Sequence, residues 1–282
     1  MKNDLERLYG LHFELSNEDR LSILQLLRDK PEKLTGISKE VQITNQQCIR
    51  HLNRLIEARM VTKTMEGLYR LTPFGVISLK LNKGFSFIAQ NSDYFLTHSL
   101  DKLPDSFVSR IGELSDSWVT PDVMVSIGEF EAIFREADEF VWVIIDQRTP
   151  SIRPLVARAV ERGVEIRSLS LIKRENYGRA QRDLDEADER IIIQSFRDDL
   201  AIAGDLDDSG VFLYMSEKAV FIAFPLEDGS FDYLGFSSSD PEAISLCADL
   251  FNHYWGQAYI IPTIEMVDRS LRWLESQGIK IE

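Results

Sequence analysis

The segment from Thr44 to Arg59 constrains the fold of this chain more than any other. Thr44 suits the N-cap of a helix, because its hydroxyl can accept a backbone N–H from the first turn. Apolar residues follow at steps of three and four, which is the pattern of a buried helix face: Cys48, Leu52, Leu55, Ile56 and Met60. The opposite face carries amide and guanidinium groups, which can reach base edges and phosphates. The segment therefore predicts a recognition helix.

The neighbouring segments predict a complete winged helix-turn-helix. Residues 34–41 are predicted as a short helix, and Gln42 and Ile43 form the turn before Thr44. Residues 61–65 and 68–71 are predicted as two strands, and Gly67 between them supplies the positive φ angle of a short hairpin turn. A small helical domain that binds a protein is the alternative for the same helices.

The predicted DNA contacts lie on this helix and hairpin: Thr44, Gln46, Gln47, Arg50, His51, Arg54, Lys63 and Arg70. Within this set, Gln46, Gln47 and Arg50 would read bases. His51 and the remaining cations would hold phosphates or enter the minor groove.

The net charge of −14 is unevenly distributed along the chain. Residues 1–75 carry 12 Lys and Arg against 10 Asp and Glu, whereas the remaining 207 residues carry 20 against 36. Residues 44–70 alone carry five basic and two acidic side chains. Because local charge sets the field at a contact surface, we expect double-stranded DNA to contact the N-terminal region and to be repelled by the rest.

Further helices are predicted on both sides of this region. Residues 5–13 are predicted as a lead-in helix, and Ser16 as the N-cap of the helix that Pro31 ends. After the hairpin, Thr72 and Pro73 begin a long helix with a seam of residues spaced by three and four: Phe74, Ile77, Leu81, Gly84 and Ile88. This seam either packs on its own domain or forms a homodimer contact. We favour the homodimer, because winged-helix repressors usually read two half-sites.

Beyond residue 115 the pattern changes to alternating strands and helices. Predicted strands at 140–145, 164–172 and 190–196 are separated by predicted helices at 151–162 and 176–189. This order implies a parallel sheet with right-handed crossovers. The expected domains are a winged helix-turn-helix DNA-binding domain at 1–75, linking or dimerisation helices at 76–115, and an α/β regulatory domain at 116–282 that senses an effector or dimerises.

A ligand site is predicted where the parallel strands end, because ligands gather at the carboxyl edge of such sheets. The side chains predicted to bind an effector there are Trp142, Asp146, Arg148, Ser170, Lys173 and Arg174. Cations beside a tryptophan would suit a small anionic or aromatic metabolite. The alternative is that Asp146 caps a loop and that the cations are ordinary surface charges.

Motifs for other chemistry are absent from the sequence. The four histidines and two cysteines lack metal-ligand spacing, and no phosphate-binding glycine loop or Gly-x-Ser-x-Gly elbow occurs. We therefore expect no catalytic residues, no metal and no cofactor. The lack of a long apolar run and of a signal peptide, with only two cysteines, predicts a cytoplasmic protein that does not bind membranes.

Several motifs resemble known families. Residues 1–75, with Arg50-His51-Leu52 in the register of the recognition helix, resemble the arsenic-repressor-like winged helices. The whole chain resembles an archaeal family of transcriptional regulators that includes the methanogenesis and filament-growth regulator, through residues 71–75, 94–95, 103–104, 111–114 and 250–255. This resemblance implies a DNA-binding regulator with a C-terminal sensing or dimerisation domain.

The C-terminal order of strands and helices also resembles half of a phospholipase-D-type fold. The catalytic motif of that superfamily, a histidine followed two residues later by a lysine, occurs at none of the four histidines. The predicted fold class is therefore α/β, with an N-terminal winged helix-turn-helix followed by a non-catalytic phospholipase-D-like domain. The predicted function is a sequence-specific, ligand-responsive or dimeric transcriptional regulator. The alternatives are a phosphodiester-cleaving enzyme of the phospholipase-D type and a protein-interaction module that does not bind DNA.

Overall fold

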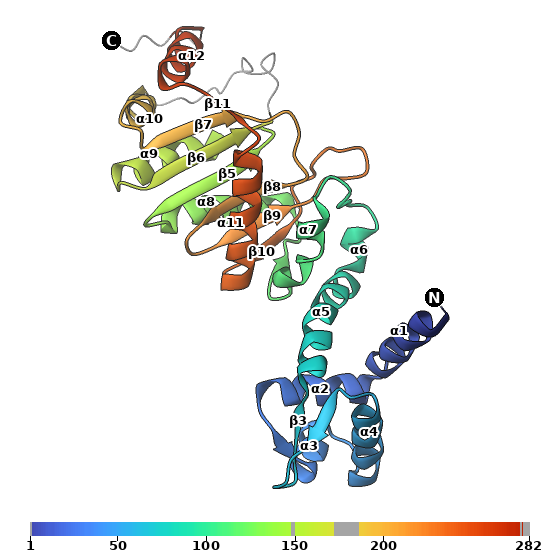
Figure 1. Cartoon of the computed structure of the whole chain (residues 1–282). Helices are drawn as coiled ribbons and strands as arrows, with labels where there is room; N and C mark the ends of the chain where they lie inside the picture. The colour runs from blue at the N-terminus through green and yellow to red at the C-terminus, as the bar shows by residue number, and fades with distance from the viewer. Residues whose placement is uncertain (1, 148–149, 172–185, 277, 279–282) are drawn as a thin grey trace. The chain divides into compact units, whose positions relative to one another are not determined.

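The chain folds into two compact units, residues 1–85 and residues 86–282. The computed structural model describes residues 2–147, 150–171, 186–276 and 278 (Figure 1). We call the two parts the N-terminal unit and the C-terminal unit and describe each by itself.

The N-terminal unit is helical with a small antiparallel sheet. Its elements in chain order are α1 (Lys2–Leu15), α2 (Glu18–Asp29), β1 (Glu32–Lys33), α3 (Leu34–Glu40), α4 (Asn45–Glu57), β2 (Val61–Lys63), β3 (Leu68–Leu71) and the start of α5 (Pro73–Gln90). The three strands pair in the order β1-β3-β2. Helix, turn, helix and hairpin follow one another as in a winged helix, which confirms the fold expected for this part of the chain.

Local chemistry fixes the ends of these elements. Gln42 adopts a φ of 58° in the turn before α4, and Gly67 adopts a φ of 80° in the hairpin. Strand β1, which the sequence did not predict, adds a third strand through the pairing of Glu32 with Tyr69. The predicted N-cap of α2 was wrong by one residue, because the side chain of Asn17, and not that of Ser16, accepts the backbone N–H of Arg20 at 3.1 Å.

The core of the N-terminal unit lies between helices α2, α3 and α4 and the small sheet. Ile23, Ile37, Leu52 and Leu55, from α2, α3 and α4, are all fully buried. Helix α5 begins against the segment that follows α4, where a Cβ atom on Gly75 would lie 2.2 Å from the backbone oxygen of Met60. A glycine is therefore required for this close approach.

The C-terminal unit is built on an eight-stranded mixed sheet in the order β11-β7-β6-β5-β8-β9-β10-β4. The strands are β4 (Trp118–Val119), β5 (Phe140–Ile145), β6 (Glu165–Ser170), β7 (Ala201–Asp205), β8 (Phe212–Ser216), β9 (Val220–Ala223), β10 (Phe236–Ser238) and β11 (Tyr259–Ile260). Strands β5, β6 and β7 are parallel, and their other neighbours pair antiparallel. The expected α/β class of this unit is confirmed.

Helices cover both faces of this sheet (Figure 1). The helical segments are α6 (Ser92–Phe95), α7 (Asp105–Val108), η1 (Ile111–Leu114), α8 (Val123–Glu136), η2 (Pro150–Ile152), α9 (Arg153–Glu161), α10 (Glu186–Arg197), α11 (Pro241–Trp255) and α12 (Thr263–Ser276). One core lies between the sheet and α11, around Leu213 and Phe251. A second core lies between the sheet and helices α8 and α9, around Phe130 and Tyr214. The unit is thus a three-layer sandwich.

The expectation of a strand at 190–196 was wrong. These residues lie in α10, and the third parallel strand is β7. The apolar run Ile191–Ile193 has no periodicity that separates a short strand from a buried helix turn, and Ile192 and Ser195 are buried at helical spacing. Most of the helix expected at 176–189 lies outside the described residues.

Candidate nucleic-acid interface

The start of helix α4 is fixed by a reciprocal capping box. The Thr44 hydroxyl accepts the backbone N–H of Gln47 at 3.2 Å, and the Gln47 side-chain oxygen accepts the backbone N–H of Thr44 at 3.0 Å. These two bonds satisfy backbone donors that the helix leaves unpaired. Thr44 and the Gln47 oxygen therefore position the helix, and only the Gln47 amide nitrogen remains to contact a base.

A row of polar side chains on α4 faces solvent. Gln46, Arg50 and Asn53 are exposed and follow one another at steps of four and three, so they share one face of the helix. Within the described parts of the chain, their side chains make no hydrogen bond or ion pair. We call these three residues the α4 row. Asn53 was missing from the predicted contacts, although the same spacing points to it.

His51 does not lie on this row. It is only 5% exposed, and its Nε2 atom is 3.1 Å from the Asp19 carboxylate, in an orientation that does not meet hydrogen-bond geometry. Burial lowers the pKa of His51, and the nearby Asp19 only partly offsets this effect. The structure thus places His51 in the interior beside Leu52, away from the exposed face on which a phosphate contact was predicted.

Arg54 connects α4 to α1. Its Nη2 atom donates to Glu14 at 2.6 Å, and its guanidinium lies 5.0 Å from the centre of the Phe13 ring. Glu14 also pairs with the buried Arg20 at 2.8 Å. Because its charge is matched by Glu14, Arg54 acts in this structure as a link between helices, whereas the sequence suggested an unpaired cation for phosphate.

The hairpin carries the two remaining predicted cations on opposite faces. Lys63 pairs across the strands with Tyr69, and Thr62 pairs with Arg70. Directly opposed residues share a face, and successive residues alternate. Lys63 lies 5.3 Å from the centre of the Tyr69 ring, and Arg70 points to the other side. The structure therefore does not bring Lys63 and Arg70 together at one phosphate.

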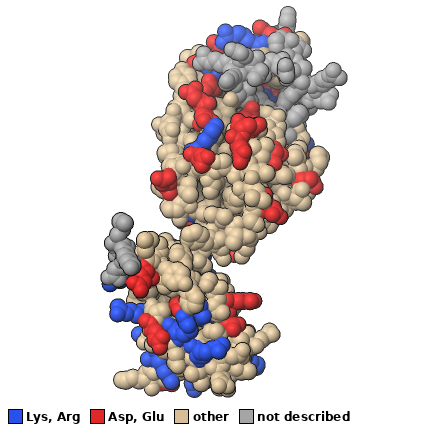
Figure 2. Space-filling view, turned by 90° about the vertical axis from the view of Figure 1, so that its right-hand side faces the viewer, with Lys and Arg blue, Asp and Glu red and all other residues tan. Residues whose placement is uncertain are grey.

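The charge distribution over the surface follows that of the sequence. Figure 2 shows Lys and Arg gathered on the N-terminal unit, whereas Asp and Glu predominate on the visible face of the C-terminal unit. Among the cations of the N-terminal unit, Arg50 and Arg70 make no ion pair with any described residue. Such uncompensated cations are the groups that a DNA backbone attracts.

The residues predicted to bind an effector are not brought together. Trp142 faces α11, where it stacks 5.0 Å from Phe251 and donates to Glu165 at 3.3 Å. The Asp146 carboxylate accepts the Tyr233 hydroxyl at 3.1 Å, and burial raises the pKa of Asp146. Ser170 lies at the end of β6 and lines a pocket on the opposite face of the sheet from Trp142. Arg148, Lys173 and Arg174 lie outside the described residues.

None of the helices that the structure describes is long and apolar enough to cross a bilayer. No group of three or more His, Cys, Asp and Glu side chains in the described segments is arranged to hold a metal ion.

Comparison with known families identifies the N-terminal unit. Residues 17–63 match the family described as bacterial regulatory protein, arsR family. This span contains α2, β1, α3, α4 and β2. Residues 17–63 are therefore similar to the helix-turn-helix domain of that family. No curated protein sequence matches the chain.

Three solved structures are similar to parts of the chain. TrmBL2, an archaeal chromatin protein with a novel mode of DNA binding, is 16% identical, with 89% of this chain and 96% of that chain covered and a TM-score of 0.41. The homodimeric winged helix-turn-helix domain of a possible ArsR-family regulator from Mycobacterium bovis is 22% identical, with 34% and 86% covered and a TM-score of 0.28. Nuc from Salmonella typhimurium, a phospholipase D family member, is 14% identical, with 51% and 95% covered and a TM-score of 0.35.

Proposed function

We propose that this chain is a sequence-specific transcriptional regulator that inserts α4 into the major groove. The observation that carries the proposal is the α4 row, because Gln46, Arg50 and Asn53 are exposed and have no partner among the described residues. Arginine suits guanine and the amides suit adenine in that groove. Lys63 and Arg70, on opposite faces of the hairpin, would contact the phosphate backbone of the DNA.

The regulator would bind DNA as a homodimer. Large apolar side chains stand exposed on two helices of the N-terminal unit: Leu5, Leu8 and Tyr9 on α1, and Ile77, Leu81 and Phe85 on α5, all at least 51% exposed. His12 and Phe85 lie 6.1 Å apart between ring centres, so α1 and α5 are neighbours. Exposed apolar surface of this extent favours a partner, and a second copy would place two recognition helices on two half-sites.

The C-terminal unit would regulate this binding, and the protein would act in the cytoplasm. We also propose that the chain is related to the archaeal methanogenesis and filament-growth regulators, because of the sequence motifs that it shares with them. Residues 1–75 would then be the DNA-binding domain, residues 76–115 the link, and residues 116–282 the regulatory domain.

The test is fluorescence anisotropy of the full chain with a duplex from the upstream region of its own gene. A scrambled duplex of the same composition and a salt titration accompany it. We expect tighter binding to the upstream duplex and a loss of affinity as salt rises. Arg50→Ala should reduce the preference for the upstream duplex. Arg28→Ala removes one positive charge from an exposed position of α2, where Arg28 pairs with its neighbour Asp29. This matched control should leave the preference unchanged. The absence of binding to either duplex at low salt would refute the proposal.

A further inference from the structure

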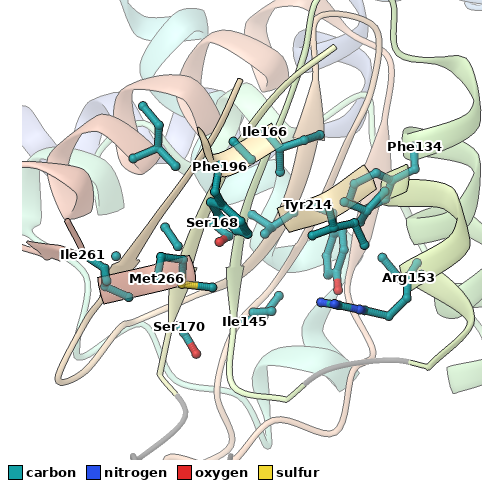
Figure 3. A pocket seen from close by; sticks show the side chains of 18 residues that line it. Phe134, Ile145, Arg153, Ile166, Ser168, Ser170, Phe196, Tyr214, Ile261 and Met266 are labelled. Carbon is teal, nitrogen blue, oxygen red and sulfur yellow. The ribbon is translucent and has the colours of Figure 1, made fainter. Parts of the chain in front are cut away.

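The C-terminal unit contains a pocket on the face of the sheet that α8 and α9 cover (Figure 3). Its cavity volume is about 110 Å³. The walls are mainly apolar and come from distant parts of the chain: Phe134, Ile145, Ile166, Phe196, Ile261 and Met266. The pocket therefore forms only when the whole C-terminal unit is folded.

Ser168 lies in the middle of the pocket floor. Its neighbours across the parallel strands are Val143 on β5 and Ala203 on β7, and all three residues line the pocket. The small side chains of Ser168 and Ala203 leave the space that larger residues would fill. No other described residue forms a hydrogen bond with the Ser168 hydroxyl. The Ser168 side chain is only partly buried, so its hydroxyl is accessible from the pocket and can form a hydrogen bond with a molecule bound there.

The positive charge of Arg153, which lines the pocket, is already balanced by a carboxylate. Arg153 donates from Nε to Glu189 at 2.7 Å, and Glu189 is 1% exposed. An anionic ligand would have to compete with this buried carboxylate for the guanidinium, and displacing it would leave Glu189 without its counter-charge. The pocket is therefore better suited to a neutral ligand than to an anion.

The size of the pocket limits the ligand further. An apolar cavity of roughly 150 Å³ in another protein holds a benzene molecule. The cavity here, about 110 Å³, is smaller but is open on one side among the described residues, so it can take part of the ring of a small aromatic alcohol. We propose that this pocket binds a small, neutral, largely apolar molecule whose hydroxyl or carbonyl group hydrogen-bonds to Ser168. Any effect of that ligand on DNA affinity rests on the proposed function, whereas binding itself does not.

The test is calorimetric titration of the full chain with benzyl alcohol, and with glucose as a polar comparison. We expect saturable binding of benzyl alcohol and no binding of glucose. Ser168→Ala removes only the hydroxyl and should weaken binding about tenfold. Ala203→Leu fills the floor and should abolish binding. Ser106→Ala, on the exposed surface of α7, is the matched control and should bind as the unmodified chain does.

Two results would overturn the proposal: no saturable binding of benzyl alcohol, or equal binding by the unmodified chain and Ser168→Ala. The second comparison remains decisive if Ala203→Leu fails to fold. DNA anisotropy in the presence of benzyl alcohol separates the two proposals. Benzyl alcohol binding by a chain that binds no DNA would support the pocket and refute the proposed function, and DNA binding without benzyl alcohol binding would do the reverse.

Discussion

Replacing Glu14 with alanine is expected to destabilise the N-terminal unit by separating α1 from α2 and α4. The Glu14 carboxylate lies 2.8 Å from Arg20, and the two side chains are 11% and 7% exposed. The same carboxylate accepts Arg54 at 2.6 Å. Removing it leaves the Arg20 charge buried without a counter-charge.

The size of the stability loss depends on the hydrogen bonds that Arg20 keeps when Glu14 is replaced. Breaking a buried ion pair by removing one partner costs about 3–5 kcal/mol. Arg20 retains hydrogen bonds to the backbone oxygens of Glu14 at 3.0 Å and Phe13 at 2.6 Å, and these reduce the cost. We expect a loss of about 2 kcal/mol in the free energy of unfolding of the N-terminal unit.

Urea denaturation can resolve this loss, because the four tryptophans, Trp118, Trp142, Trp255 and Trp273, all lie in the C-terminal unit. Far-UV circular dichroism follows the helices of both units, whereas tryptophan fluorescence follows only the C-terminal unit. The midpoint of the N-terminal transition should fall by about 1 M urea, and the fluorescence transition should stay in place.

Glu6→Ala, at an exposed carboxylate on the same helix, controls for the loss of charge and should change the midpoint little. A midpoint shift for Glu14→Ala no larger than that for Glu6→Ala would refute the stabilising role of the Glu14–Arg20 ion pair.

Three further predictions concern the same unit. Gly75→Ala should lower the free energy of unfolding, measured by urea denaturation, by about 1–3 kcal/mol, because its Cβ would meet a backbone oxygen. The control Gly10→Ala places its Cβ where nothing lies within 4 Å and should not destabilise the unit. Equal effects of the two substitutions would contradict this prediction. Because burial lowers the pKa of folded His51, the unfolded chain takes up a proton first as pH falls below about 6.5. Stability should therefore fall between pH 7 and 5, and His51→Gln should flatten that dependence; an unchanged slope would contradict the assignment. Leu81→Glu on α5 should halve the mass measured by light scattering, and a persisting dimer would place the interface elsewhere.

The sequence predicted the winged helix because its signals are local. The N-cap at Thr44, the turn at Gln42 and the glycine of the hairpin each act within a few residues, so their meaning does not depend on distant contacts. The buried positions Cys48, Leu52 and Leu55 of α4 were also readable from spacing alone, whereas Ile56, expected on the same buried face, is 36% exposed.

The sequence could not predict which polar residues of α4 are already engaged. His51 and Arg54 look like DNA contacts by residue type, but Asp19 and Glu14 lie 32 and 40 positions earlier in the chain and meet them only after folding. The pocket around Ser168 was missed for a related reason. Its floor depends on the register of three parallel strands, and its walls depend on which face of the sheet each helix covers.

The central claim is that the α4 row reads DNA sequence through Arg50. The most direct test is the ratio of dissociation constants for the scrambled and the upstream duplex, measured by anisotropy for the unmodified chain, Arg50→Ala and Lys63→Ala. Arg50→Ala should reduce that ratio by a factor that corresponds to about 1–3 kcal/mol. Lys63→Ala should weaken binding to both duplexes equally and lower the salt slope by about one. An unchanged ratio for Arg50→Ala would contradict the account.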